Sequence, residues 1–152
     1  MTRALTPAVG AVLLVVVTVA LAGLTGAIVL GSDPAESPPR ARLTLDVDAG
    51  ADRIAVTHES GDTLSTEALT VRVEVDGRAL AYQPPVPFFA ARGFVSGPTG
   101  PFNSGGDTTW TAGETAALEL ATTNAPTIDP GETVAVTVAT DRGTIARLEA
   151  VA

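Results

Sequence analysis

The first thirty residues of the chain are apolar almost throughout, whereas the remainder alternates polar and apolar positions. Residues 8–30 contain no charged side chain. A helix of that length would reach roughly 35 Å, enough to cross the hydrocarbon core of a bilayer. Gly31 matches the preference for glycine just after a helix, and three prolines within residues 34–39 forbid its continuation. The pattern therefore predicts one hydrophobic α-helix, long enough to be transmembrane, and then a Pro-rich linker over residues 32–40.

From Arg40 onward the pattern has a period of two, which is typical of half-buried β-strands. Such runs cover residues 42–48, 52–58, 69–75 and 144–151. Asp76-Gly77 is a strong signal for a two-residue hairpin, and it leads into a strand expected at residues 79–82. No amphipathic helix pattern interrupts these runs. We therefore expect residues 41–152 to form an antiparallel, immunoglobulin-like β-sandwich of about seven or eight strands.

An internal similarity supports an all-β region. Residues 111–122 align with residues 129–140 at an offset of eighteen and match at six of twelve positions. Each copy begins with a Gly turn and continues into a run that ends in Ala-Thr. Two copies are too few for a solenoid, so we interpret them as two turn-and-strand units.

The charge of the chain excludes some functions. From Ser32 onward, seventeen acidic residues face eight arginines, a net charge of −9, and lysine is absent from the whole chain. Such a surface would be repelled by nucleic-acid phosphates, so no nucleic-acid partner is expected. It is typical of a soluble surface domain, and also of proteins that work in concentrated salt. The absence of cysteine excludes disulfides, thiolate metal sites and lipidated cysteines.

Two general interpretations of the N-terminal segment remain open. In the first it is a secretory signal peptide: Arg3 is a minimal basic region, Ala20-Leu21-Ala22 is an A-x-A cleavage site, and Gly23 would begin the mature chain. The continuation of the apolar stretch to Leu30 argues against this interpretation. In the second it is an uncleaved single-span anchor, with Arg3 inside and the acidic domain outside.

A third interpretation uses the residues around the helix start. Thr6 can act as the N-cap, and Pro7 is favoured in the first turn because its missing N–H costs nothing there. The stretch of residues 3–31, RALTPAVGAVLLVVVTVALAGLTGAIVLG, resembles the N-terminus of archaeal type IV pilins of the haloarchaeal type. In that family a short basic leader precedes a small residue, a Ser/Thr-Pro pair, a Val-Gly pair and a long apolar helix.

The resemblance implies a processing step and a location. A prepilin peptidase would cut between Arg3 and Ala4, which makes residues 1–3 the leader and residues 4–31 the hydrophobic helix, transmembrane at first and then part of the filament core. The protein would then reside in the cell membrane as a precursor and move into an extracellular surface filament. Its expected partners are copies of itself and other pilins, the peptidase, the pilus assembly machinery and, before assembly, the membrane.

Small residues along the segment predict where helices would pack. Thr18, Ala22 and Gly26 share one i, i+4 line, and Gly23 with Ala27 forms a second small-xxx-small pair. Gly10 is a further small position near the helix start. Within lipid, helices associate where small residues let their backbones approach closely, although glycine and alanine are also simply frequent in membrane helices.

The resemblance extends into the predicted head over four stretches. These are DRIAVTHESGDTL at residues 52–64, GPTGPFN at 97–103, TTWTAGE at 108–114 and DPGETVAVTV at 129–138. They are less specific than the N-terminal motif. The resemblance implies an adhesive or surface-contacting head.

All six aromatic residues lie between positions 82 and 110, in a segment rich in proline and glycine. They are Tyr82, Phe88, Phe89, Phe94, Phe102 and Trp110. Either the rings close one end of the core from a long loop, or some of them form an exposed contact surface.

Little in the sequence indicates catalysis. His58 is the only histidine, so neither a His-based metal site nor a Ser-His pair has a second member, and we expect it at a strand end beside a turn. The closely spaced carboxylates are expected on a solvated surface. Asn103-Ser104-Gly105-Gly106-Asp107 lacks the spaced acids of a dedicated calcium loop. We therefore predict a structural protein without catalytic, metal-binding or cofactor-binding residues.

Overall fold

The computed structural model describes residues 5–30 and 37–152, with side chains described for residues 9–22 and 37–152. The chain divides into two compact units, residues 1–36 and residues 37–152, each of which is considered by itself. The first unit contains the helix α1 (Leu5–Leu30). The second is entirely β-sheet, turns and short 3-10 helices. One N-terminal helix is therefore followed by an all-β antiparallel region, as the hydrophobic pattern predicts.

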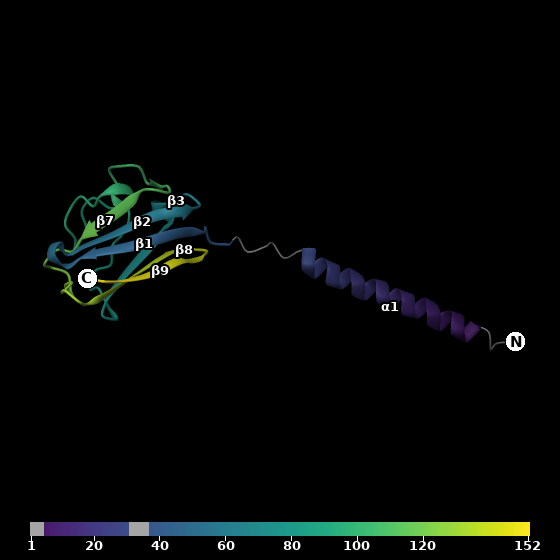
Figure 1. Cartoon of the computed structure of the whole chain (residues 1–152). Coiled ribbons are helices and arrows are strands. Elements are labelled where there is room, and N and C mark those ends of the chain that lie inside the picture. Colours follow the sequence, from purple (N-terminus) through teal and green to yellow (C-terminus); the bar gives the residue numbers. More distant parts are fainter. Residues whose placement is uncertain (1–4, 31–36) are drawn as a thin grey trace. The chain divides into compact units, whose positions relative to one another are not determined.

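Nine strands make up the second unit (Figure 1). They are β1 (Ala41–Asp48), β2 (Arg53–Gly61), β3 (Leu64–Ser65), β4 (Thr70–Val75), β5 (Arg78–Ala79), β6 (Thr109–Trp110), β7 (Thr115–Glu119), β8 (Thr133–Thr140) and β9 (Gly143–Val151). Three 3-10 helices cover Ala49–Ala51, Thr66–Ala68 and Gly100–Phe102. The strands form a three-stranded sheet ordered β1-β2-β7, a four-stranded sheet ordered β5-β4-β8-β9 and a small β3-β6 sheet.

The β4–β5 hairpin confirms the expected turn. Asp76 and Gly77 have φ values of 48° and 73°, as a two-residue turn with two left-handed positions requires. The following strand is shorter than the predicted 79–82, because β5 ends at Ala79. Beyond it the Gln83 side chain takes over the pairing. Its Oε1 accepts from Val73 N at 2.7 Å, and its Nε2 donates to Val73 O at 3.0 Å.

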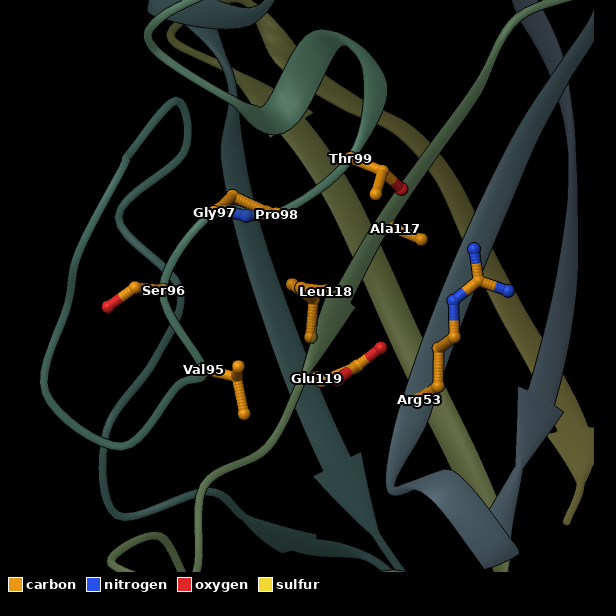
Figure 2. Close-up of a pocket in the computed structure, with 9 residues that line it drawn as sticks. All are labelled: Arg53, Val95, Ser96, Gly97, Pro98, Thr99, Ala117, Leu118 and Glu119. Atoms are coloured by element: carbon orange, nitrogen blue, oxygen red, sulfur yellow. The ribbon is translucent and has the colours of Figure 1, made fainter.

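A segment of the long aromatic loop borders the three-stranded sheet at β7 (Figure 2). Val95 N donates to Glu119 O at 3.0 Å, and Thr99 exchanges two backbone hydrogen bonds with Ala117 at 2.8 and 3.1 Å. Gly100 allows this approach, because a Cβ there would collide with the carbonyl oxygen of Thr115. The segment thus satisfies backbone groups that an open sheet edge would leave exposed.

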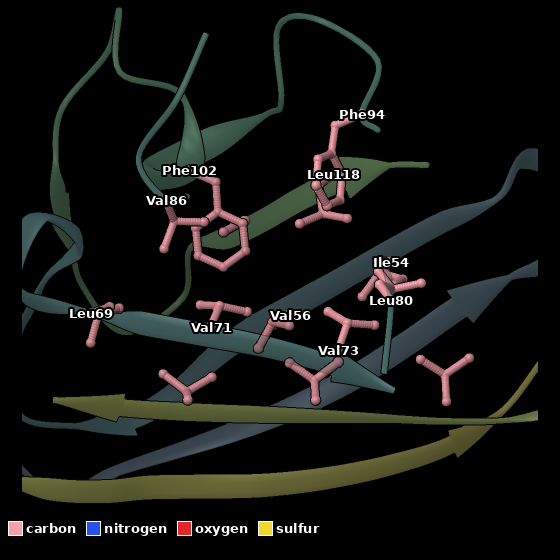
Figure 3. Packing of buried hydrophobic residues seen from close by; sticks show 14 of the residues in the cluster. Ile54, Val56, Leu69, Val71, Val73, Leu80, Val86, Phe94, Phe102 and Leu118 are labelled. Atoms are coloured by element: carbon pink, nitrogen blue, oxygen red, sulfur yellow. The ribbon is translucent and has the colours of Figure 1, made fainter. Parts of the chain in front are cut away.

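Alternate residues of both larger sheets enter one hydrophobic cluster (Figure 3). On β4 and β8 the buried valines are Val71, Val73, Val75, Val134, Val136 and Val138, and Ala135 of β8 is also buried. On β2 and β7 they include Ile54, Val56, Ala116 and Leu118. This period-two burial is what fixes the register, because a slip of one residue would turn each apolar set toward solvent.

The two similar segments fold into equivalent turns. In the first, Glu114 Oε2 accepts from Thr111 N at 2.6 Å, and in the second, Glu132 Oε2 accepts from Asp129 N at 2.9 Å. Between these residues lie Gly113 and Gly131, with φ values of 94° and 90°. The turns lead into β7 and β8, so the interpretation of two turn-and-strand units is confirmed.

Candidate assembly helix and contact surface

The described surface of α1 is apolar on all sides. Its large side chains between Val9 and Leu21 are 47 to 70 % exposed within the chain. The one hydroxyl among them is satisfied locally, because Thr18 Oγ1 donates to Leu14 O at 2.7 Å. A helix without a polar face is stable only when an apolar partner or phase covers it. Among residues 9–22 and 37–152, whose side chains are described, no helix is long and apolar enough to cross a membrane.

The predicted processing and packing positions are only partly described. Arg3 and Ala4 lie outside the described residues. The helix begins at Leu5, so Thr6 and Pro7 lie within α1. The cap and processing roles stay predictions.

Among the predicted packing positions, Gly10, Thr18 and Ala22 lie in the described part of α1. A Cβ built on Gly10 would meet no heavy atom within 4 Å. Gly23, Gly26 and Ala27 lie in α1, but in the part of the helix for which only the backbone is described. Packing between copies therefore stays a prediction.

The aromatic rings do not form one contact surface. Four of the five predicted contact residues are core residues at most 5 % exposed: Phe88, Phe94, Phe102 and Trp110. Trp110 packs edge-on against Phe102 with ring centroids 5.3 Å apart, and Phe88 lies 5.5 Å from Phe94. A contact role is thus wrong for these four in the folded chain, because the rings supply the core's largest apolar surfaces. Phe89 alone of the five is exposed, at 61 %.

Asn124 anchors the loop that carries Phe89. Its buried side chain donates from Nδ2 to Tyr82 O at 3.0 Å and to Gly93 O at 3.1 Å. Its Oδ1 accepts from Tyr82 N at 3.1 Å and from Ala125 N at 3.0 Å. One amide group therefore ties both ends of residues 82–93 to the turn after β7, a role that no local sequence signal indicates.

A groove lies beside Phe89, and we call it the Phe89 groove. It is an open surface depression of about 630 Å³, lined by Phe89, by loop residues 97–101, by Asn103, by residues 105–107 and by Glu114. This volume is within the usual range for small-molecule sites. The other cavity bordering this loop, between Val95 and Arg53 (Figure 2), holds only about 90 Å³ and is too small for an organic ligand.

The polar side chains of the Phe89 groove are held in place by short local hydrogen bonds. Asn103 Oδ1 accepts from Gly105 N at 2.8 Å, and Asp107 Oδ1 accepts from Thr109 N at 2.8 Å. Backbone and side-chain hydrogen bonds from Thr109 lower the pKa of Asp107, so this carboxylate is charged at neutral pH. Glu114 uses Oε2 to bind Thr111 N and Oγ1.

His58 is not the strand-end residue that the sequence suggests. β2 continues to Gly61, and the imidazole is fully buried with its centroid 6.0 Å from the Trp110 ring. Neither ring nitrogen has a hydrogen-bond partner. The alternation of polar and apolar residues could have indicated this burial, because His58 lies two and four residues after Val56 and Ile54 and so shares their face of β2. Among the described residues, no three His, Asp or Glu side chains are grouped to hold a metal ion.

The remaining close carboxylates lie mostly on exposed strand faces. Glu74 and Glu149 flank Arg147, whose guanidinium lies 3.1 Å and 3.6 Å from their carboxylate oxygens. The three residues come from β4 and β9, and β8 runs between those strands. This arrangement is an ordinary cross-strand ion network without the features of a catalytic pair.

Taken together, the geometry defines a two-part protein, in which a helix that needs an apolar partner precedes an acidic β-sheet unit. Residues 3–43 match the family model described as archaeal type IV pilin, N-terminal. The N-terminal region of this chain is therefore similar to that of archaeal type IV pilins. No curated protein matches the chain. The family match ends within β1, so the resemblance of the head motifs and the haloarchaeal type stay predictions.

Proposed function

We propose that the chain is the structural, non-enzymatic subunit of an archaeal type IV pilus-like surface filament. A prepilin peptidase removes residues 1–3, the precursor waits in the cell membrane, and the subunit then polymerises through α1. The head is an immunoglobulin-like antiparallel β-sandwich that faces solvent and makes contacts with surfaces. The observation that carries the proposal is the pilin match over residues 3–43 on a helix apolar on every described side.

The free energy of apolar burial favours states in which lipid or other helices always cover α1. Apolar burial contributes roughly 25 cal/mol per Å², so leaving α1 in water would be costly. In lipid the helix is covered by acyl chains, and in a filament by identical helices. Transfer between these two environments exchanges one apolar contact for another, so backbone approach at small residues decides whether helices associate. The Thr18–Ala22–Gly26 line supports such an approach.

The test combines the N-terminal sequence of the mature protein with imaging of cells that carry or lack the gene. We expect a mature chain that starts at Ala4, and filaments that disappear with the gene. Ala22→Leu should reduce filament number by placing bulk on the small-residue line, whereas Val19→Leu, beside that line, should not. A chain that begins at Gly23 would indicate secretion. A chain that keeps Met1 or Thr2 and forms no filaments would indicate a simple anchor, and either result would refute the proposal.

A further inference from the structure

The ring of Phe89 is exposed on a rigid base. Its neighbour Phe88 is buried, and Phe88 N donates to Phe102 O at 2.8 Å. Phe89 O itself accepts from Gly97 N at 2.7 Å. The backbone on both sides of the ring is therefore fixed, so an exposed phenyl group is presented without the entropy cost of ordering a flexible loop.

Hydrogen-bonding groups that local structure leaves unused surround this ring. In the Phe89 groove, Asn103 binds through Oδ1 only, and Asp107 binds Thr109 N through Oδ1. Glu114 binds Thr111 through Oε2. The Asn103 Nδ2 donor and Glu114 Oε1 thus remain for a ligand, and Asp107, which Thr109 binds through its backbone and side chain, adds an exposed carboxylate. At Gly97, which also lines the groove, a Cβ would meet no heavy atom within 4 Å, so the absence of a side chain lets a ligand approach the backbone there.

The composition of the groove argues against a protein partner. In the described head, the exposed large hydrophobic residues are Phe89, Val95 and Val151. A stable protein interface covers about 800 Å² per partner and is built around a cluster of buried apolar anchors. One ring flanked by an amide and two carboxylates provides too little apolar surface for a stable protein interface.

The same set of groups fits a sugar. The C–H face of a pyranose packs on an aromatic ring, and its hydroxyls pair with amide and carboxylate groups at the rim. We propose that the Phe89 groove binds a neutral saccharide, with Phe89 as the stacking platform and Asn103, Asp107 and Glu114 as hydroxyl partners. Uronic acids are disfavoured, because their carboxylate would face two like charges.

The experiment uses the full chain, purified in a detergent without a sugar headgroup. Saturation-transfer NMR measures binding of glucose, galactose, mannose, N-acetylglucosamine and glucuronic acid. We expect transfer to the ring protons of at least one neutral sugar and weaker transfer to glucuronic acid. Phe89→Ala should weaken binding roughly tenfold, and Phe89→Trp should retain it because the larger ring preserves the platform. Val95→Ala, an exposed change in the same loop, is the matched control and should bind as the unmodified chain does.

Three results would overturn the proposal. They are no binding of any neutral sugar, equal binding by the Phe89→Ala chain, and a self-associated head that Phe89→Ala converts to monomer in sedimentation. The last result would mean that the Phe89 ring packs against a second copy of this chain. The saccharide site extends the surface-contact role proposed above, but it is measured on dispersed chains. A negative result would therefore leave the filament proposal intact, and absence of filaments would leave the saccharide site intact.

Discussion

The side-chain amide of Asn124 pairs with both backbone polar groups of Tyr82, accepting from its N–H at 3.1 Å and donating to its carbonyl at 3.0 Å. It reproduces the pairing that a neighbouring strand would provide. Since the same amide also reaches Gly93, one buried residue holds the base of the loop that presents Phe89. The position of the candidate contact surface thus depends on a residue outside it.

Replacing Asn124 with alanine should therefore be costly. The change leaves the N–H and carbonyl of Tyr82 without their partner, and we expect a loss of roughly 2–4 kcal/mol in the free energy of unfolding. Chemical denaturation followed by circular dichroism measures this loss. Thr123→Ala, at an exposed neighbouring position, should change it by less than about 0.5 kcal/mol. Equal effects of both changes would show that the amide network contributes little.

The buried imidazole of His58 offers the opposite test. Both of its ring nitrogens lack partners, so an apolar side chain of similar volume removes a desolvation cost without opening a cavity. We expect His58→Leu to raise the free energy of unfolding by roughly 1–2 kcal/mol. His58→Asn, which keeps the site polar and leaves a void, should lower it. A less stable His58→Leu chain would mean that the imidazole makes a polar interaction in solution.

Gly61 should not tolerate a side chain. It has a φ of 113°, and a Cβ would collide with the carbonyl oxygen of Arg40, beside the two hydrogen bonds that join Arg40 to Asp62. We expect Gly61→Ala to cost roughly 2 kcal/mol or more, measured by thermal unfolding. Gly77→Ala is the control, because its φ of 73° carries a strain of roughly 1 kcal/mol but the space around it is open. Similar costs at both sites would contradict the close approach at Arg40.

Salt should stabilise the head. Residues 37–152 carry fifteen acidic side chains and eight arginines, so most pairwise interactions between charges are repulsive. Raising KCl from about 0.1 to about 1 M shortens the screening length from roughly 10 to 3 Å. We expect a gain of roughly 1 kcal/mol, or about 4 °C in the melting temperature of the full chain. A melting temperature that falls with salt would show that attractive ion pairs, such as Arg147 with Glu74, dominate instead.

Local signals in the sequence predict the elements well. The runs at residues 42–48 and 69–75 coincide with β1 and β4 within one residue, since alternation is a property of the strand itself. The hairpin at Asp76-Gly77 follows from the left-handed conformations that these residues allow. The uncharged stretch of residues 8–30 lies within α1, which begins three residues earlier, at Leu5, and ends at Leu30.

Long-range relations could not be predicted in this way. β7 pairs with β2, and β8 pairs with β4 as well as with the adjacent β9; the two distant pairings are set by burial over the whole unit. Phe88 and Phe89 are adjacent and chemically identical, yet one is in the core and the other is exposed. Composition places both in one aromatic segment, and only the folded backbone distinguishes them. The Asn124 contacts depend on residues more than thirty positions away.

The amide of Gln83 occupies the outer side of β4 at Val73, just where the two-residue strand β5 stops. A chain with no glutamine there would offer an open ladder position to any extended peptide nearby. When many heads are concentrated side by side, such an opening invites strand exchange and tangling between subunits. We expect the Gln83 side chain, together with Leu80 N, which also donates to Val73 O, to limit such exchange between crowded heads.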